Sequence, residues 1–173
     1  MMGSPEFASC PREFQTAWRE LQIAEGPSGE SGPQLLADWW DRLGVDCRRA
    51  AVASVWTMTR EPTRFVTAAT WLRWLDAVGY FSVDRQHHLG SHRLTQSTPL
   101  YRGATPERSR GLAWSVKREV AETRAAFCRS EGLDGKLYSC VVEPTMILAV
   151  LECRDEWEVL VRPEGLDRMR EII

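Results

Sequence analysis

The spacing of apolar residues changes near the middle of the chain, and this change constrains the fold more than any other sequence feature. Before residue 80 the apolar side chains recur at the spacing of one helix face. After residue 98 they alternate or form short unbroken runs between turn residues, which indicates strands. The sequence therefore predicts an α+β fold, with a helical region at 9–83, a polar linker at 84–97 and a core that contains strands at 98–173.

The helical region holds most of the tryptophan in the chain, namely Trp18, Trp39, Trp40, Trp56, Trp71 and Trp74. Because tryptophan buries a large apolar area, this region is predicted to have a core of its own. Asp46 is the predicted N-cap of one helix, and the last helix is predicted to run from near Pro62 to Gly79. The side chains expected to be buried include Trp18, Trp56 and Leu72.

The composition is that of a globular protein. With 173 residues, 43% hydrophobic and 27% charged, the chain has the size of one ordinary domain or two very small ones. Its formal charge of −2 gives no electrostatic argument for binding nucleic acid. No apolar run could span a bilayer and no signal peptide opens the chain, so no membrane partner is expected. Residues 1–8 are interpreted as a cloning remnant.

The cysteines and histidines bear on compartment and on metal binding. Five cysteines are scattered along the chain without a Cys-x-x-Cys pair, which predicts reduced, mostly buried thiols and a cytoplasmic protein. His87, His88 and His92 lie close together in the linker. No cysteine or carboxylate accompanies them at ligand spacing, so we interpret the stretch as an exposed polar linker and expect no metal.

The C-terminal region is predicted to contain five strands and one helix. The strands are expected at 99–103, 111–116, 136–142, 146–151 and 154–161, and the helix at 117–129. In the last strand Glu156 and Glu158 point to one face, and Trp157, Val159 and Val161 line the other. Two interpretations are open: a carboxylate pair placed for chemistry, or the solvent-exposed face of an edge strand.

Two further motifs precede this strand in a fixed order. Arg102 lies in Tyr101-Arg102-Gly103, and Ser115 lies in Gly111-Leu112-Ala113-Trp114-Ser115. An arginine, a serine and a Glu-x-Glu, each on a short apolar segment, resemble the ADP-ribosyltransferases of the Arg-Ser-Glu type. The resemblance covers residues 98–163 and is closest to small bacterial and phage-associated members. It implies a split β-sandwich that transfers ADP-ribose from NAD to an acceptor and releases nicotinamide, without a metal.

The resemblance also implies roles for individual residues. Glu158 would hold the ribose hydroxyl and stabilise the positive charge that develops on the sugar, and Ser115 would brace it. Glu156 would orient or deprotonate the acceptor. Arg102 would bind the phosphates or the adenine ribose of NAD. The implied NAD-binding set is completed by Tyr101, Gly103, Trp114 and Phe127.

Each of these residues also has an ordinary structural explanation. Arg102 alone would be a surface ion pair, Ser115 could cap the helix that begins at Lys117, and Phe127 could belong to the core. Three functions therefore stay open: a mono-ADP-ribosyltransferase acting as a toxin, effector or phage modifier, an NAD glycohydrolase, and a non-catalytic binding module. The expected partners are NAD, a macromolecular acceptor, with protein (arginine in particular) favoured over nucleic acid, and an antitoxin or inhibitor.

Overall fold

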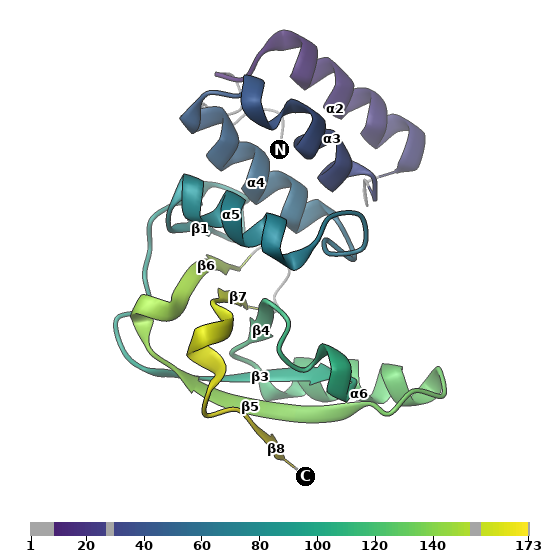
Figure 1. The fold of residues 1–173 in the computed structure, drawn as a ribbon, viewed down its shortest axis with the longest axis vertical. Helices are drawn as coiled ribbons and strands as arrows, with labels where there is room; N and C mark the ends of the chain where they lie inside the picture. The colour runs from purple at the N-terminus through teal and green to yellow at the C-terminus, as the bar shows by residue number, and fades with distance from the viewer. Residues whose placement is uncertain (1–8, 27–29, 153–156, 173) are drawn as a thin grey trace. The chain divides into compact units, whose positions relative to one another are not determined.

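The computed structural model describes residues 9–26, 30–152 and 157–172. It is an α+β protein whose chain divides into two compact units (Figure 1). The helical unit comprises residues 1–81 and 87–89, and the sheet unit comprises 82–86 and 90–173. The predicted linker at 84–97 is thus divided between the two units, and it contains the short strand β2 (Leu89–Gly90).

The helical unit is built around one helix, α4, whose second half is buried on all sides. Residues 50–57 of α4 are all buried, the pattern of a helix surrounded by its neighbours. Gly44, in an extended conformation, is the N-cap of this helix, so the prediction of Asp46 as N-cap is wrong and Asp46 lies in the first turn. The elements of the unit are α2 (Arg12–Glu25), α3 (Gly32–Trp39), η1 (Trp40–Arg42), α4 (Val45–Met58) and α5 (Ala68–Val78).

The tryptophans form the connected core that the sequence predicts. Trp71 is fully buried, packs edge to face against Trp56 and Trp74, and donates its indole N–H to the Pro62 carbonyl at 2.8 Å. Trp18 is also buried, with 3% of its surface exposed. The two predictions for Trp18 and Trp56 are confirmed.

The predicted start of the last helix is wrong. α5 begins at Ala68, because the Thr67 side chain accepts the Thr70 N–H and caps the helix there. With this start, the buried stripe consists of Trp71, Trp74 and Leu75, and Leu72 is only half-buried. The end of the helix at Gly79 is confirmed, and this glycine has a φ of 68°, in the left-handed region.

A disulfide joins Cys10, at the start of the helical unit, to Cys47 in α4. Their Cα atoms are 4.9 Å apart, and both residues are buried. The expectation of reduced thiols is therefore wrong for this pair, because the fold brings together two cysteines that are separated by 37 residues. Cys128 and Cys140 are free thiols. Cys153 lies outside the described residues.

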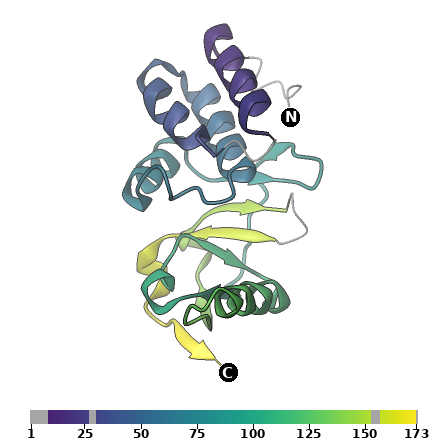
Figure 2. The same cartoon turned by 90° about the vertical axis from the view of Figure 1, so that its right-hand side faces the viewer.

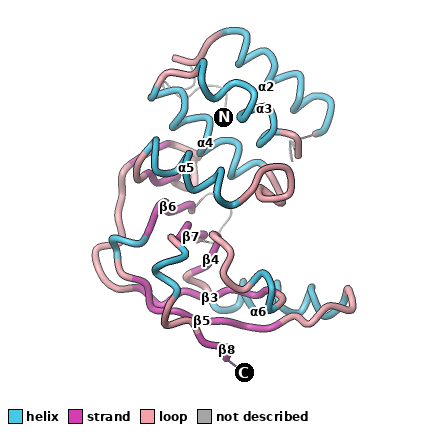
Figure 3. Tube along the Cα trace, viewed as in Figure 1, coloured by secondary structure: helices cyan, strands magenta, loops and turns pink. Residues whose placement is uncertain are grey.

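The described strands form an eight-stranded sheet in the order β2-β1-β6-β7-β4-β3-β5-β8, and Figure 3 labels β3 to β8. All of it belongs to the sheet unit except Phe81 of β1 and Leu89 of β2. The predicted strands and the helix are confirmed to within about two residues, except that β7 begins at Glu158. Besides β2, the strands of the sheet are β1 (Phe81–Val83), β3 (Thr98–Ala104), β4 (Ala113–Ser115), β5 (Lys136–Val142), β6 (Ile147–Leu151), β7 (Glu158–Val161) and β8 (Arg170–Ile172). The helices of the sheet unit are η2 (Pro106–Arg108), α6 (Arg118–Ser130), η3 (Pro144–Met146) and η4 (Pro163–Leu166).

Strand β7 lies inside the sheet, between β6 and β4. The interpretation that Glu158 lies on the solvent-exposed face of an edge strand is therefore wrong. The residue before it, Trp157, has a φ of 44°, so the strict alternation predicted across 154–161 does not pass through this position. The Trp157 carbonyl nevertheless accepts the Val116 N–H at 3.2 Å, which extends the link between β7 and β4.

Helix α6 packs on one face of this sheet (Figure 2). A Cβ at Gly103 would lie 1.9 Å from the Ala121 carbonyl oxygen and 2.5 Å from the Ala125 nitrogen, so glycine allows the helix to approach β3 closely. The side of the sheet that Gly103 faces is called the α6 face below. Within the described part of the chain, no helix has the length and apolar character needed to cross a membrane.

Candidate functional site

Three of the predicted site residues lie in one row across three neighbouring strands. Tyr101 of β3 is the pairing partner of Ser115 in β4, and Ser115 is the partner of Glu158 in β7. Residues directly opposite each other project to the same face, with Cβ atoms about 5 Å apart. Tyr101 is two residues from Gly103, so this row lies on the α6 face. The sheet thus places a carboxylate, a hydroxyl and a phenol side by side.

Glu158 occupies an unusual position for a carboxylate. The three residues that follow it, Val159 to Val161, have no exposed surface, whereas Glu158 itself is half-buried. Its partners on both sides, Leu151 and Ser115, are buried, with 3% and 6% of their surface exposed. A charged group in such surroundings loses hydration and needs a polar partner. This position is therefore a strong candidate for function.

Ser115 fixes the turn between β4 and α6. Its Oγ accepts the Lys117 N–H at 3.0 Å, and Lys117 is the N-cap of the helix. The interpretation of Ser115 as the cap of this helix is therefore wrong: Lys117 is the N-cap, and Ser115 bonds the N–H of that residue. A serine hydroxyl can accept one hydrogen bond and donate another, so this local role is compatible with a bond to a carboxylate.

Arg102 is held by the backbone of the β3–β4 connection. Its Nε donates to the Arg108 carbonyl at 3.0 Å, and its Nη1 donates to the Ala113 carbonyl. A Cβ at Gly111 would lie 2.2 Å from the Arg102 Nη2, so a side chain there would displace the guanidinium from its present position. Sequence reasoning missed Gly111 as a supporting residue; the only signal was a glycine that directly precedes the strand with Ser115.

Burial lowers the pKa of Arg102 to about 10, and the charge of Glu158 opposes this effect. The positive charges of Arg108 and Arg124 lower the pKa of Arg102 further. The pairing register places Tyr101, and not its neighbour Arg102, in the row with Ser115 and Glu158. By strand alternation Arg102 therefore projects toward the face opposite the α6 face, outside the row of Ser115 and Glu158. The charge of Glu158 still raises the pKa of Arg102.

The other predicted NAD-binding residues are distributed over both faces. Tyr101 is half-buried in the row, and Gly103 is covered by α6. Trp114 is buried in the core, where its indole N–H donates to the Gly111 carbonyl at 2.9 Å. Phe127 lies on α6 with 51% of its surface exposed, so its assignment to the core is wrong. Glu156 lies outside the described residues.

A second feature of the α6 face lies beside the row, at β5 and β8. It is an open pocket of about 700 Å³, lined by α6 residues such as Glu122 and Arg129 and by Leu137, Glu171 and Ile172 of the two strands. Its charged rim is already paired in part, since Lys136 forms an ion pair with Glu171 at 3.1 Å. Among the described residues, no group of histidine, cysteine or carboxylate side chains could hold a metal ion.

Comparisons of the chain with protein-family models, with curated proteins and with solved structures return no match.

Proposed function

We propose that the protein transfers ADP-ribose from NAD to a macromolecular acceptor, on an ADP-ribosyltransferase-like sheet. The observation that carries the proposal is the pairing of Ser115 with Glu158 on two neighbouring interior strands. Tyr101 extends the same row on the next strand. The order Arg102, Ser115 and Glu158 in the sequence, together with the adjacent strands β3, β4 and β7, supports the proposal.

In this proposal Glu158 acts on the sugar. The bond between the ribose C1′ and the nicotinamide nitrogen breaks, and its electron pair leaves with nicotinamide. Positive charge develops on the ribose, as in glycoside cleavage, and the carboxylate stabilises that charge more in the transition state than in the ground state. Ser115 donates a hydrogen bond from its hydroxyl to Glu158 and so holds the carboxylate in place. The Ser115 Oγ also accepts the Lys117 N–H.

The acceptor completes the reaction. Its nucleophile forms the new bond to C1′ and gives up a proton, for which Glu156 is the proposed base. A protein acceptor, with arginine as the favoured side chain, is proposed over nucleic acid. A role as a toxin, effector or phage modifier, with an antitoxin or inhibitor as a partner, belongs to the same proposal.

The cytoplasmic location remains a prediction, and the Cys10–Cys47 disulfide weighs against it. Disulfides persist mainly in oxidising compartments. A count of accessible thiols in protein taken directly from its native cells, before and after reduction, separates the two locations.

The first test is the replacement Glu158→Gln, which keeps the shape of the side chain and removes its charge. We expect nicotinamide release from NAD to fall about a hundredfold or more, because one positioned electrostatic contact is lost. Glu164→Gln is the matched control, since Glu164 is an exposed carboxylate just after β7 and should leave the rate unchanged.

Labelled NAD separates the candidate functions. Label on a macromolecule that disappears with Glu158→Gln supports transfer. Nicotinamide release without labelling would favour the glycohydrolase, and the absence of release in the unmodified protein would leave only a binding module. Undiminished release in Glu158→Gln would refute the proposed mechanism.

A further inference from the structure

The open pocket at β5 and β8 lies where the sheet ends. Strand β8 is the last strand in the order of the sheet, so its outer backbone groups have no pairing strand among the described residues. Unpaired N–H and C=O groups along a strand edge are a template for another extended chain. The pocket together with this free edge is called the β8 groove below, and all of it belongs to the sheet unit.

The pairing register places the floor of the β8 groove on the α6 face. Gly103, which α6 covers, pairs with Leu137, and Leu137 pairs with Ile172. Leu137 and Ala125 are buried and Ile172 is half-buried, so the floor of the groove is apolar. Its volume of about 700 Å³ falls within the range of ligand pockets, roughly 300–1,000 Å³.

A strand added to β8 would point side chains into this space. Neighbouring strands lie about 4.8 Å apart, and alternate side chains project to the same face. A ninth strand therefore places every second side chain on the α6 face next to Ile172. These side chains also lie beside the helix stripe of Glu122, Ala126 and Arg129. An aliphatic side chain suits this position, because the floor of the groove is apolar.

The two carboxylates that line the groove are already paired. Glu122 forms an ion pair with Arg118 at 2.8 Å, and Glu171 forms one with Lys136 at 3.1 Å. Their negative charge is therefore balanced within the protein, and the groove has little attraction for a basic partner.

Two arginines at the groove lack such a balance. Arg129 donates to the Gly135 carbonyl at 2.7 Å, and Arg170 is exposed on the α6 face, two residues before Ile172. No carboxylate in the described part of the chain forms an ion pair with either arginine. An acidic side chain two positions from the aliphatic one would lie opposite Arg170 and supply the missing charge.

We propose that an extended segment of a partner protein pairs with β8 as a ninth strand, with an aliphatic side chain in the β8 groove and an acidic side chain opposite Arg170. Backbone hydrogen bonds supply the affinity in this mode of binding, and the two side chains supply the specificity. The pattern recognised is an aliphatic residue and a carboxylate two positions apart, a spacing that places both on one face of a strand. The site requires no NAD chemistry and is independent of the proposed transferase.

The probe is a synthetic peptide, Thr-Glu-Thr-Leu-Thr-Glu-Thr, blocked at both ends and titrated into the full chain. Threonine favours strands, and the leucine and both glutamates share one face. We expect saturable shifts in the amide NMR signals of Ile172 and Ala126. Arg170→Glu should raise the Kd about tenfold, because an attraction becomes a repulsion. A peptide with lysine in place of both glutamates should bind this variant more tightly than the original peptide does.

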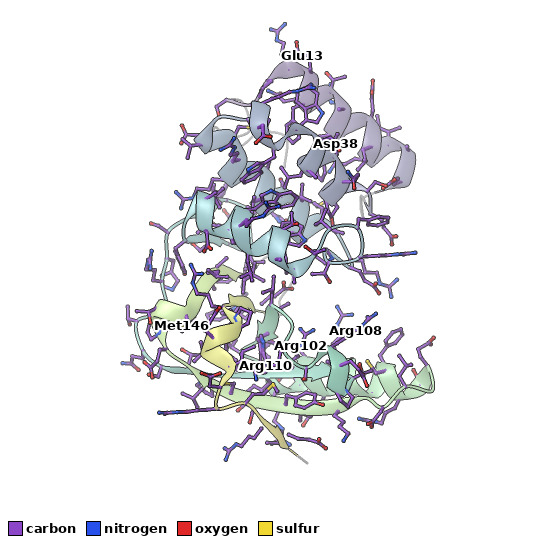
Figure 4. All side chains as sticks on the ribbon, in the orientation of Figure 1. Glu13, Asp38, Arg102, Arg108, Arg110 and Met146 are labelled. Carbon is purple, nitrogen blue, oxygen red and sulfur yellow. A yellow bond between two sulfur atoms is a disulfide. The ribbon has the colours of Figure 1, made fainter. Side chains whose placement is uncertain are left out.

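Ala126→Phe tests the groove itself. Ala126 is exposed and lines the groove, so the larger ring should occupy the space of the leucine, raise the Kd about tenfold and leave the melting temperature unchanged. Arg108→Glu is the matched control, since it makes the same change of charge at an exposed arginine outside the groove (Figure 4). It should change the Kd less than about twofold.

Strand pairing is tested through the peptide backbone. Methylation of the peptide nitrogens of the leucine and of both neighbouring threonines removes N–H groups on both edges of the strand, and it should abolish binding. The proposal is overturned if the original peptide does not bind, if the methylated peptide binds as tightly, or if Arg108→Glu weakens binding as much as Arg170→Glu. A dimer of the protein alone that Arg170→Glu dissociates would assign the edge to a second copy and would also overturn it.

Discussion

The helical unit and the sheet unit bury different chemistry. In the helical unit the largest buried side chains are aromatic, and its buried hydroxyls are satisfied nearby, as when Thr57 donates to the Ala53 carbonyl at 2.9 Å. In the sheet unit Arg102 is half-buried and held by two backbone carbonyls, and Ser115 is buried beside the half-buried Glu158. Enclosed charge lowers stability unless distant residues supply partners. The helical unit is therefore the expected source of apolar stability, whereas the sheet unit holds the polar groups on which the proposed function depends.

The largest effect expected from this comparison concerns the two most deeply buried tryptophans. Trp71→Ala in the helical unit and Trp114→Ala in the sheet unit should each lower the free energy of unfolding by about 3–5 kcal/mol, because each leaves a large cavity. Hydrogen exchange measured on α4 and on β7 shows where the protection is lost. We expect Trp71→Ala to weaken α4 first and to spare nicotinamide release from NAD.

Trp114→Ala should do the opposite, weakening β7 and abolishing nicotinamide release, because Trp114 pairs with Val159 next to the pair of Ser115 and Glu158. If both variants reduce protection equally in both places, the two units unfold together and the division of roles is refuted.

The second effect concerns the disulfide of the helical unit. Reduction of Cys10–Cys47 should lower the free energy of unfolding by about 2–4 kcal/mol, because the unfolded chain is released from a loop of 37 residues. Denaturant unfolding with and without reductant measures the change. The double variant Cys10→Ser/Cys47→Ser is the control and should not respond to reductant. Unchanged stability after reduction, with all five thiols reactive in the untreated protein, would restore the expectation of reduced cysteines.

The smallest effect concerns pH and a single carboxylate of the helical unit. The Ser31 hydroxyl and N–H both donate to Glu25, and these bonds hold the pKa of Glu25 below its ordinary value. A lowered folded-state pKa gives stability that is present above the ordinary pKa of 4.5 and is lost as the pH falls through the folded value. Because Glu25 is exposed, we expect these bonds to contribute less than about 1 kcal/mol to the free energy of unfolding.

Ser31→Ala should remove this part of the acid dependence, measured by thermal unfolding between pH 3 and pH 6, a range of about three units around the ordinary pKa. Ser130→Ala in the sheet unit is the control, since its hydroxyl donates to the Phe127 carbonyl and contacts no carboxylate in the described structure. An equal response of the two variants would mean that the Glu25 bonds do not set the acid stability.

Much of the helical unit was predictable because its determinants are local. Helical spacing indicated that Trp18 and Trp56 lie inside, and both are buried. The error at Leu72 has an equally local cause, since the Thr67 cap starts α5 later than Pro62 suggested and rotates the buried stripe. The disulfide could not be predicted, because its two cysteines meet only when α4 packs against the start of the chain.

The sequence by itself predicted the strands that carry an arginine, a serine and a glutamate, though not β2 and β8. Only the tertiary structure decided how those strands pair. A shift of one residue in register moves every side chain of a strand to the opposite face. With Tyr101 opposite Ser115, and Ser115 opposite Glu158, the phenol joins the row and Arg102 is left to brace the connection from the other face. Register depends on contacts between residues far apart in the chain, so no local pattern could assign Arg102 to that position.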